Sequence, residues 1–452
     1  MRPILALSIL ISLSSPLAAA AQSCLEGTAR LSDQRDLREL AAAIETTCPC
    51  SSFTGAQGLT HAAYISCAKQ ARSDAELAGD LRPECRRQAT KALRATTCGT
   101  SKVACGRFKA TARSPASCRV KPADRCADRP SFQESACSAT HCSDVTEWTA
   151  GTCLDPRAPG PYGAGIRVVT YTKPSVVNPA MDRVLANTLI WYPTADTGTI
   201  NSGYNAIVDA SVDGAHGPYP VVLFSHGSCG FPGQSVFLTS LLATHGFIVI
   251  APPHPGNTIG DFPSCGSFQA QVSSAQERPQ DMIFVLDQIL AADADSGSDF
   301  FGLVDETAIA MTGHSFGGLT TYLVQAIEPR VTAAMPMAPA AGPASMLTVP
   351  SLTMIGEIDS VVNNTATRTA YANSVAPKRL VEILDAGHFA FSGGCFAGPD
   401  CNPPVTLTQP EAHDAVLRYA VPFLETTLNG NAAWEPLLEA PPSPTFVVES
   451  EP

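Results

Sequence analysis

The chain has 452 residues, of which 45% are hydrophobic, so two or three domains and a sizeable buried core are expected. Its net charge of −12 is uneven: residues 22–150 hold 18 Lys and Arg against 14 Asp and Glu, whereas residues 151–452 hold 10 against 27. The acidic second part excludes nucleic acid as the expected partner, because it would repel phosphate. The small basic excess of the first part is scattered, as on a solvated surface, and weak attraction to an anionic surface stays open.

Residues 1–21 have the layout of a secretory signal peptide. Arg2 precedes a mostly apolar run over residues 4–13, and the small residues 18–21 offer an A-x-A type cleavage site. That run is too short to span a bilayer, and no later stretch reaches the roughly 18 apolar residues that a membrane helix needs. We therefore expect an exported protein, secreted or periplasmic, without a membrane span.

Residues 22–153 are rich in cysteine. Twelve of the 16 cysteines fall there and four follow, and both groups are even, as disulfide pairing in an oxidising compartment requires. A zinc site is disfavoured, because the paired C-x2-C spacing of such sites is missing. Apolar spacing predicts helices within residues 36–47 and 59–97. We expect a small, mainly helical, disulfide-rich domain whose pairing the spacing does not determine.

A segment with linker chemistry, residues 154–164, leads into a region of alternating strands and helices. The predicted strands are residues 166–171, 185–191, 219–225, 247–251, 307–312, 331–337, 351–355 and 380–384, and the predicted helices are 234–245, 281–292, 319–326 and 411–428. Near-continuous apolar strands alternating with helices are typical of a parallel sheet covered on both faces. We expect an α/β catalytic domain over residues 165–430 and a Pro-rich tail, extended and partly disordered, over 431–452.

Ser315 is the predicted nucleophile. It lies in the sequence GHSFG, directly after the predicted strand 307–312 and before the predicted helix 319–326. A strand, a GxSxG turn and a helix form the nucleophile elbow of the α/β-hydrolase fold, and the glycines are needed where neighbouring backbones crowd that turn. A serine hydroxyl needs a base to take its proton, and this fold supplies an acid and then a histidine later in the chain.

Two histidines follow the serine. His388 comes after the predicted strand 380–384, where a base can reach back to the elbow, whereas His413 lies inside the last predicted helix and is expected at the surface. The acid is expected in the loop after strand 351–355, where both Glu357 and Asp359 are candidates. We favour Asp359, because the extra residues let it curl towards the histidine, and we interpret Asp385 as a turn residue.

The oxyanion of an ester-cleaving intermediate needs preorganised N–H donors. One is the backbone of Phe316, directly after the nucleophile, and the other is expected in the loop that follows strand 219–225. We assign it to Ser228, with Gly227 as the alternative. His226 and His314 are interpreted as packed, hydrogen-bonded side chains.

Four cysteines of the second region flank these loops. We call residues 226–230, the loop after strand 219–225, the oxyanion loop. A disulfide between Cys229 and Cys265 would stiffen this loop, and one between Cys395 and Cys401 would brace the loop that carries the base. Both pairings are hypotheses.

Several segments resemble known families. They are residues 219–231 (YPVVLFSHGSCGF), 242–258 (LATHGFIVIAPPHPGNT), 313–318 (GHSFGG), 349–362 (VPSLTMIGEIDSVV) and 386–391 (AGHFAF). They resemble platelet-activating-factor acetylhydrolases of the plasma type, dienelactone-hydrolase-like bacterial esterases, and cutinases and polyester hydrolases, over residues 167–428 and not over the cysteine-rich part. The resemblance implies the α/β-hydrolase fold and hydrolysis of carboxylic esters. It also implies Ser315, Asp359 and His388 as a triad and the N–H groups of Ser228 and Phe316 as oxyanion donors, with no cofactor or metal.

Two departures narrow this expectation. The plasma-type enzymes place their acid after the strand that follows the nucleophile helix, but residues 335–339 (MPMAP) hold no carboxylate, so the acid position is cutinase-like. Dienelactone hydrolases use a cysteine as nucleophile, whereas this chain has a serine, Ser315, at that position. We expect a secreted serine ester hydrolase that acts through an acyl-enzyme on short or medium acyl or lipid esters.

Two alternatives stay open. The first is a cutinase-like polyester hydrolase, whose cysteine-rich part would hold it on a surface. The second is a binding or adhesion protein with an inactive hydrolase fold, which the presence of all three triad residues disfavours. The expected partner is the ester substrate, and the sequence indicates no oligomeric state.

Overall fold

The chain divides into two compact units, residues 1–153 and 154–452, and each is described by itself. The computed structural model describes residues 23–24, parts of 37–47, and residues 48–55, 59–94, 96–108, 117–126, 133–137, 156–342, 344–394, 407–432, 434–439 and 446–451. The predicted signal peptide and the predicted Cys395–Cys401 disulfide lie outside these residues. Among the helices that are described, none combines the length and the apolar character needed to cross a bilayer.

The first unit combines helices with a small sheet. Helix α2 (His61–Ala78) is followed by α3 (Arg86–Arg94), and the strands are β1 (Val103–Phe108), β2 (Ser117–Lys121) and β3 (Gln133–Cys137). Gly79 ends α2 in the left-handed conformation at φ 86°, which glycine adopts without strain. The antiparallel sheet, in the order β2-β1-β3, was not predicted from the sequence.

Disulfides join the elements of this first unit. The described pairs are Cys24–Cys85, Cys48–Cys67, Cys50–Cys98 and Cys105–Cys126. Cys48 and Cys50, two residues apart, bond to different partners, so both sulfurs are used in disulfides. Disulfides of this density are common where a small domain has a modest hydrophobic core.

The second unit is built on one sheet with helices on both faces. Its strands are β4 (Gly163–Pro174), β5 (Asp182–Thr194), β6 (Ile207–Val208), β7 (Tyr219–Ser225), β8 (Ile248–Ala251), β9 (Val304–His314), β10 (Ala333–Met337), β11 (Ser351–Gly356), β12 (Lys378–Ile383) and β13 (Phe446–Glu451). Its helices are α4 (Val236–Thr244), α5 (Phe268–Ala294), α6 (Phe316–Gln325), α7 (Asn364–Asn373), α8 (Gln409–Thr427) and α9 (Glu435–Glu439). Short 3-10 helices span Ile259–Asp261, Ser264–Gly266 and His388–Phe391.

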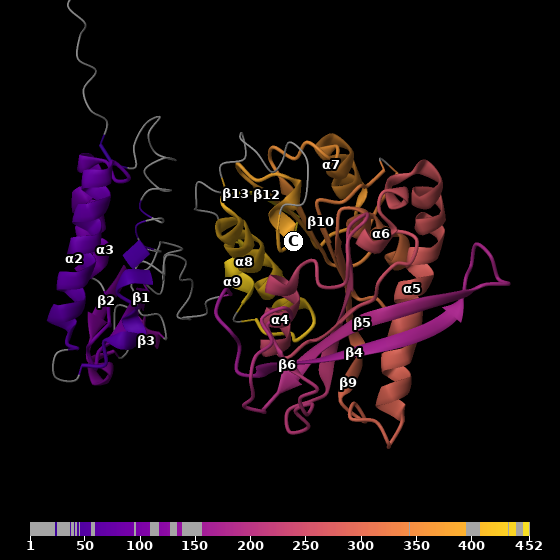
Figure 1. The fold of residues 1–452 in the computed structure, drawn as a ribbon, viewed down its shortest axis with the longest axis horizontal. Helices are drawn as coiled ribbons and strands as arrows, with labels where there is room; N and C mark the ends of the chain where they lie inside the picture. The colour runs from indigo at the N-terminus through magenta and orange to yellow at the C-terminus, as the bar shows by residue number, and fades with distance from the viewer. Residues whose placement is uncertain are drawn as a thin grey trace, which may run out of the picture. The chain divides into compact units, whose positions relative to one another are not determined.

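The strand order is β13-β12-β11-β10-β9-β7-β8-β5-β4-β6, and the middle of the sheet, from β8 to β12, is parallel (Figure 1). Strand β5 pairs antiparallel with β4 and β8, and β13 pairs antiparallel with β12. This is the mostly parallel α/β-hydrolase arrangement expected from the sequence. Because β7 lies between β8 and β9, the connections that follow β7 and β9 run in opposite directions across the sheet. Ligand sites form beside such a switch point, at the carboxyl ends of the strands.

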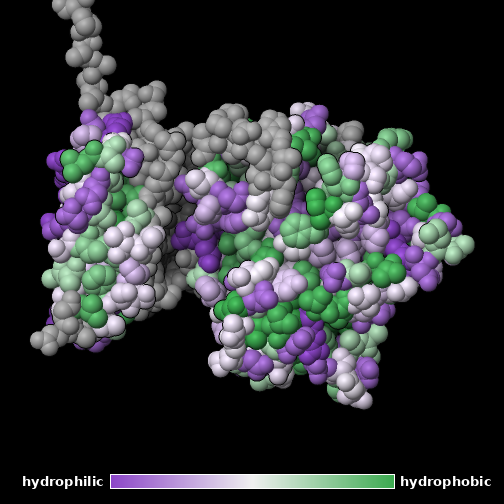
Figure 2. All heavy atoms as spheres, in the orientation of Figure 1, coloured by the Kyte–Doolittle hydropathy of each residue, from purple (hydrophilic) through white to green (hydrophobic). Residues whose placement is uncertain are grey.

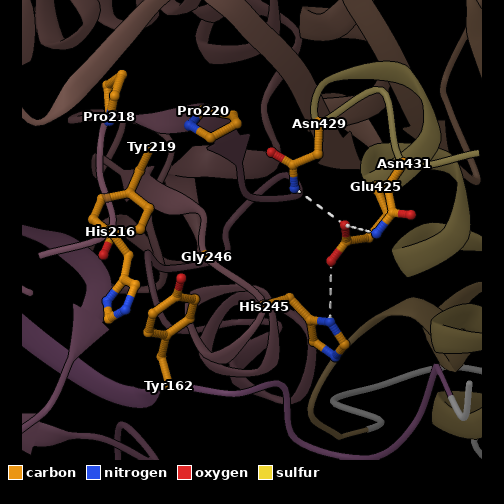
Figure 3. A pocket seen from close by; sticks show the side chains of 10 residues that line it. All are labelled: Tyr162, His216, Pro218, Tyr219, Pro220, His245, Gly246, Glu425, Asn429 and Asn431. Atoms are coloured by element: carbon orange, nitrogen blue, oxygen red, sulfur yellow. Dashed lines mark hydrogen bonds and ion pairs between the residues drawn. The ribbon is translucent and has the colours of Figure 1, made fainter.

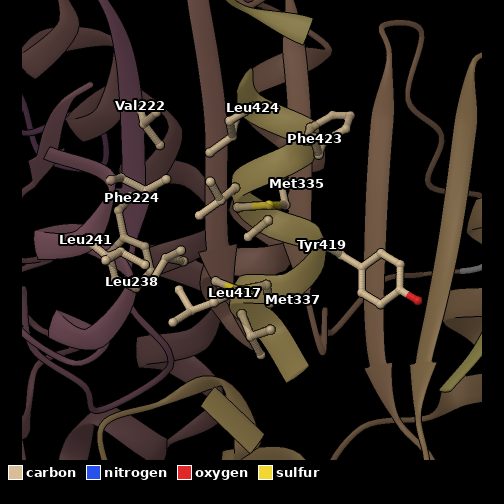
Figure 4. Close-up of a cluster of buried hydrophobic side chains, with 14 of the residues drawn as sticks. Val222, Phe224, Leu238, Leu241, Met335, Met337, Leu417, Tyr419, Phe423 and Leu424 are labelled. Carbon is tan, nitrogen blue, oxygen red and sulfur yellow. The ribbon is translucent and has the colours of Figure 1, made fainter. Parts of the chain in front are cut away.

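Alternate residues along the strands supply two separate cores. On one face, Val222 and Phe224 of β7 pack with α4 and α8, as Figure 4 shows for Leu238, Leu241 and Leu417. The other face joins Val221 and Leu223 of the same strand to α5 and α6. Successive side chains of a strand point to opposite faces of the sheet. Both faces of β7 are covered by helices, which explains why this strand is largely apolar and buried at every position.

Helix α5 runs through a proline. The sequence predicted a helix only over residues 281–292, but α5 begins at Phe268 and contains Pro279 in its interior. Proline removes one backbone hydrogen bond and usually ends or kinks a helix. Here burial of Met282, Val285 and Leu286 against the sheet holds the helix together across it.

The C-terminal tail is part of the sheet. An extended, partly disordered tail was expected, whereas β13 pairs with β12 in a register that sets Phe446 opposite Ile383 and Glu451 opposite Lys378. The side chains of Lys378 and Glu451 also form an ion pair at 3.4 Å. Ahead of β13, Trp434, Leu437 and Leu438 are buried in the same core as α8. The expectation was wrong because the tail becomes ordered by pairing with β12, and the sequence of the tail alone does not indicate that partner strand.

Candidate active site

Ser315 occupies the turn between β9 and α6. Its backbone has φ 59° and ψ −116°, a strained conformation for a residue with a side chain and the one that the nucleophile elbow imposes. A Cβ on Gly313 or Gly317 would overlap the carbonyl oxygen of Ser225 in β7. The two glycines therefore let the turn pack directly on β7, while Ser315 itself stays partly exposed between buried neighbours.

The histidine and the favoured acid meet. His388 begins the 3-10 helix after β12, and its Nδ1 lies 2.8 Å from Oδ2 of Asp359, which follows β11. The other oxygen, Oδ1, accepts hydrogen bonds from the N–H groups of Val361 at 2.8 Å and Val362 at 2.9 Å. Both side chains are almost fully buried. The carboxylate is therefore fixed by the backbone on one side and holds the imidazole on the other.

The alternative acid, Glu357, and the alternative histidine, His413, have other partners. The carboxylate of Glu357 accepts a hydrogen bond from the N–H of Asp385, and Asp385 sits in a turn at φ 60°. His413 lies on α8, where its ring stacks on Phe237 at 3.6 Å and its Nε2 bonds the carbonyl of Ser392. His413 was expected at the surface, and the structure places it half-buried there.

Gln234, a buried side chain that was not predicted from the sequence, joins the loop of Gly227 to His314 beside the serine. Gln234, just before α4, accepts a hydrogen bond from the N–H of Gly227 at 2.8 Å and bonds Nδ1 of His314 at 2.6 Å. The opposite nitrogen of His314 lies 2.8 Å from the carbonyl oxygen of His388. Burial and the neighbouring His388 lower the pKa of His314 well below its usual range, so His314 is a neutral linker between the elbow and the loop of His388.

These hydrogen bonds distinguish between Gly227 and Ser228, the two candidates for the second oxyanion donor. The N–H of Gly227 is used by Gln234, so it is not directed at a substrate. Ser228 is exposed, and its hydroxyl accepts hydrogen bonds from Gln271 at 2.6 Å and Asn257 at 3.3 Å. Phe316 is the first residue of α6, where backbone N–H groups have no partner within the helix. The geometry therefore favours Ser228 over Gly227.

A second row of serine, histidine and aspartate lies behind the oxyanion loop. His254 bonds the hydroxyl of Ser225 through Nε2 at 2.9 Å and Oδ2 of Asp281 through Nδ1 at 2.9 Å. All three residues are fully buried. Without exposure this row cannot meet a substrate, so its effect is on structure. The described parts of the chain hold no group of three or more His, Cys, Asp or Glu residues suited to a metal ion.

The predicted disulfide between Cys229 and Cys265 is present, with 5.5 Å between the Cα atoms. It joins the residue after Ser228 to the 3-10 helix ahead of α5, and the carbonyl of Cys265 accepts hydrogen bonds from Asn257 and Gln271, the same two side chains that hold the Ser228 hydroxyl. The bridge and these amides together fix the oxyanion loop.

Replacing Cys229 and Cys265 together with serine is expected to lower the free energy of unfolding by about 2–4 kcal/mol, because the bridge constrains the unfolded chain. We also expect kcat to fall by about tenfold, since a small displacement of a reacting group is costly. Denaturant unfolding and steady-state kinetics measure the two effects. The Cys105→Ser/Cys126→Ser variant is the matched control and should keep kcat. An unchanged kcat in the first variant would show that the bridge does not position the loop.

Stability is expected to fall below about pH 6.5. Burial is the main cause that lowers the pKa of His226, His254 and His314 well below 6.5. In the unfolded chain these histidines take up protons near pH 6.5, so between the folded pKa values and 6.5 the unfolded state binds more protons. Their contribution is complete above pH 6.5 and is lost by up to about 1.4 kcal/mol per pH unit for each histidine as the pH falls.

Denaturant midpoints at pH 7.5, 6.0 and 5.0, followed by tryptophan fluorescence, measure this loss. His216→Asn is the control, since the side chain of His216 is 63% exposed, and it should leave the slope with pH unchanged. Equal midpoints at pH 7.5 and 5.0 would contradict the expectation.

A pocket of about 380 Å³ lies at the opposite edge of the sheet from Ser315. It is lined by Tyr219 and Pro220, at the amino end of β7, and by Glu425 of α8 (Figure 3). His245, Asn429 and Asn431 all bond the carboxylate of Glu425, as the dashed lines of Figure 3 show. Side chains of the protein thus bond this carboxylate, and this pocket is separate from the serine site.

Comparison with known proteins gives a consistent result. The model of a PETase family, described as PET hydrolase-like, matches residues 188–397, which include Ser228, Ser315, Asp359 and His388. Two curated relatives from Thermobifida alba, the cutinases est2 and est1, are 29% and 28% identical over 177 residues, or 38% of this chain. The match spans about half the length of these relatives, 53% and 54%.

One solved structure similar to this chain is a ferulic acid esterase from Streptomyces cinnamoneus, with a TM-score of 0.54 and 22% identity. The alignment covers 64% of this chain and 98% of that one. This similarity shows the α/β-hydrolase fold. The region around Ser315 therefore resembles cutinase-type polyester hydrolases in sequence and an esterase in fold.

Proposed function

We propose that this chain is a serine hydrolase of carboxylic esters, with Ser315 as nucleophile, His388 as base and Asp359 as the acid that orients it. The observation that carries the proposal is the 2.8 Å bond between His388 and a backbone-fixed Asp359, in loops that follow neighbouring strands of the sheet that also carries the elbow of Ser315. The resemblance to cutinases and to a PET hydrolase-like family over the same residues supports it.

The proposed reaction has two halves. His388 takes the hydroxyl proton of Ser315 as its oxygen attacks the ester carbonyl, and Asp359 stabilises the imidazolium that forms. The N–H groups of Phe316 and Ser228 bind the oxyanion. The alcohol then leaves with the proton from His388, and an acyl-enzyme remains on Ser315. In the second half, His388 takes a proton from water as the water oxygen attacks the acyl group, and His388 returns that proton to the oxygen of Ser315 as the acid leaves.

Apolar side chains around the oxyanion loop favour an apolar ester. Phe231 lies two residues after Cys229, and Ile259, Phe262 and Phe268 flank Cys265. All four are exposed, Phe262 by 72% and Phe268 by 83%. Figure 2 shows hydrophobic side chains exposed among hydrophilic ones on the face of the second unit that it presents. Medium acyl or lipid esters are therefore the proposed substrates.

A polyester is the second candidate substrate. The first observation that favours it is the match to a PET hydrolase-like family. The second is the position of Asp359 after β11, which is the position of the acid that the resemblance to cutinases implies. Export completes the proposal, because five described disulfides require an oxidising compartment. The signal peptide expected at residues 1–21 would direct it.

A fluorophosphonate probe, which reacts with activated serines, tests the catalytic proposal. Labelling of the wild type and of Ser202→Ala, with none of Ser315→Ala, is the expected result; Ser202 lies in an exposed turn. Equal labelling of all three proteins would refute it, and so would no labelling at all, as for a binding protein with an inactive fold. Hydrolysis of p-nitrophenyl esters of graded length, phospholipid vesicles and polyester film then separates the candidate substrates, with and without residues 22–153.

A further inference from the structure

Arg278 of α5 lies fully buried behind the oxyanion loop. One terminal nitrogen of its guanidinium donates to the carbonyl of His226 and, at 3.3 Å, to the hydroxyl of Ser225. The other donates to the carbonyl of Gly227 at 3.0 Å and to Oδ1 of Asn257. A single planar cation thus holds two consecutive carbonyls of the loop, and no residue of the proposed triad is among these partners.

Because Arg278 fixes the directions of these two carbonyls, it also fixes the directions of the N–H groups in the same peptide units. In a trans peptide the C=O of one residue and the N–H of the next point to opposite sides. The carbonyl of His226 faces Arg278, and the N–H of Gly227 accordingly points the other way, to Gln234 beside the elbow. By the same rule, the carbonyl of Gly227 facing Arg278 directs the N–H of Ser228 away from the guanidinium.

The proposed nucleophile lies close to this loop. A Cβ added to Gly227 would lie 3.4 Å from Cβ of Ser315, so the loop passes beside the serine with room for little more than one atom between them. The carbonyl of Gly227 also bonds the N–H of Gly230 at 3.1 Å and Nδ1 of His226 at 2.7 Å. Three donors on one oxygen, one of them a cation, polarise the peptide and make the N–H of Ser228 a stronger donor.

Arg278 also contacts Phe316, the residue of the other proposed oxyanion donor. Its guanidinium carbon lies 4.7 Å from the centre of the Phe316 ring, a cation–π distance. The contact packs the first residue of α6 against the same cation that holds the oxyanion loop. One side chain is therefore shared by the two segments from which the oxyanion donors come.

We propose that Arg278 is a positioning residue that preorganises the oxyanion hole, by fixing the Gly227–Ser228 peptide and packing against Phe316. This inference rests on the proposed ester hydrolysis and extends it to a residue that does not touch the substrate. Lysine cannot replace it, because an ammonium is a point charge and lacks the planar fork that reaches both carbonyls and Asn257.

Other charged groups lie around this cation. Arg183 of β5 makes a two-pronged bond to Asp281 at 2.7 Å, and Asp281 holds His254. Burial lowers the pKa of Arg278 to about 9, while the charge of Asp281 opposes that shift, so the guanidinium is charged at neutral pH. Burial, Arg278 and Arg183 lower the pKa of His254, which is therefore neutral and adds no competing charge.

The test compares an ester with its thionoester, in which sulfur replaces the carbonyl oxygen. A well-formed oxyanion hole discriminates against the larger, weakly accepting sulfur, whereas a disordered hole discriminates less. Arg278→Lys is expected to lower kcat for a p-nitrophenyl ester by about 10²-fold with little change in KM, and to lower the ester-to-thionoester ratio of kcat by about tenfold. Active-site titration with the fluorophosphonate corrects for the amount of folded enzyme.

Arg183→Lys is the matched control. It alters a buried, ion-paired arginine of the same network that has no bond to the loop carbonyls, so it should lower stability and leave the ratio unchanged. If Arg278→Lys does not fold, Arg278→Gln makes the same test, because its neutral amide buries no charge and lacks the planar fork that reaches both carbonyls and Asn257, so it should lower the ratio in the same direction. A wild-type ratio in the folded variant overturns the inference.

The outcomes for the two proposals are distinguishable. A wild type that neither hydrolyses the ester nor reacts with the probe at Ser315 refutes the proposed function. An active, Ser315-labelled wild type whose Arg278 variant keeps the wild-type ratio refutes only the role of Arg278.

Discussion

Ser315→Ala is expected to lower kcat for a p-nitrophenyl ester by about 10⁴–10⁶-fold, because the acyl-enzyme can no longer form. The change removes one hydroxyl from a residue that already has the strained backbone of the elbow, so the free energy of unfolding should stay the same or rise slightly. Initial rates with burst analysis measure the first effect, and denaturant unfolding measures the second.

Ser202→Ala removes a hydroxyl from an exposed turn and should keep full activity. A Ser315→Ala protein with more than about a tenth of the wild-type rate would mean that another group is the nucleophile.

Asp359→Asn is expected to lower kcat by about 10⁴-fold with little change in KM. The asparagine has nearly the same shape, but its amide can present N–H to Nδ1 of His388, which favours the wrong tautomer and removes the charge that stabilises the imidazolium. The carboxylate also accepts two backbone bonds, from Val361 and Val362, so some loss of stability should accompany the loss of activity. Kinetics over a range of substrate concentrations separates kcat from KM.

Glu357→Gln is the control for the choice of acid. It lies two residues earlier in the same loop, and its only described partner is the N–H of Asp385, so kcat should stay within about twofold of wild type. The opposite pattern, with Glu357→Gln inactive and Asp359→Asn active, would reassign the acid.

Local patterns were enough to predict much of the second unit. The strand that precedes Ser315, the glycines on either side of it and the helix that follows are adjacent in sequence, so the elbow could be predicted from a few residues. The loops of Asp359 and His388 could be placed because each directly follows an apolar strand. The fixed chain order of the fold then supplied the partners.

The support behind the site could not be predicted, because it depends on distant residues. Arg278 meets Gly227 across 51 positions, and Pro279 beside it favoured a helix that starts later. Gln234 bonds His314 across 80 positions, and nothing in a lone buried glutamine indicates that partner. Hydrogen bonds of this kind come from the packing of helices on the sheet, which periodicity alone does not specify.

Strand β13 decides how the second unit ends. By pairing along β12 it saturates the outer hydrogen-bonding groups of the strand that leads directly to the loop of His388. A chain shortened to residue 439 would uncover that edge, and an uncovered edge is a template for strands of other molecules. Such a truncation therefore invites self-association beside the loop of His388, and an affinity tag fused after Glu451 would begin immediately at this edge.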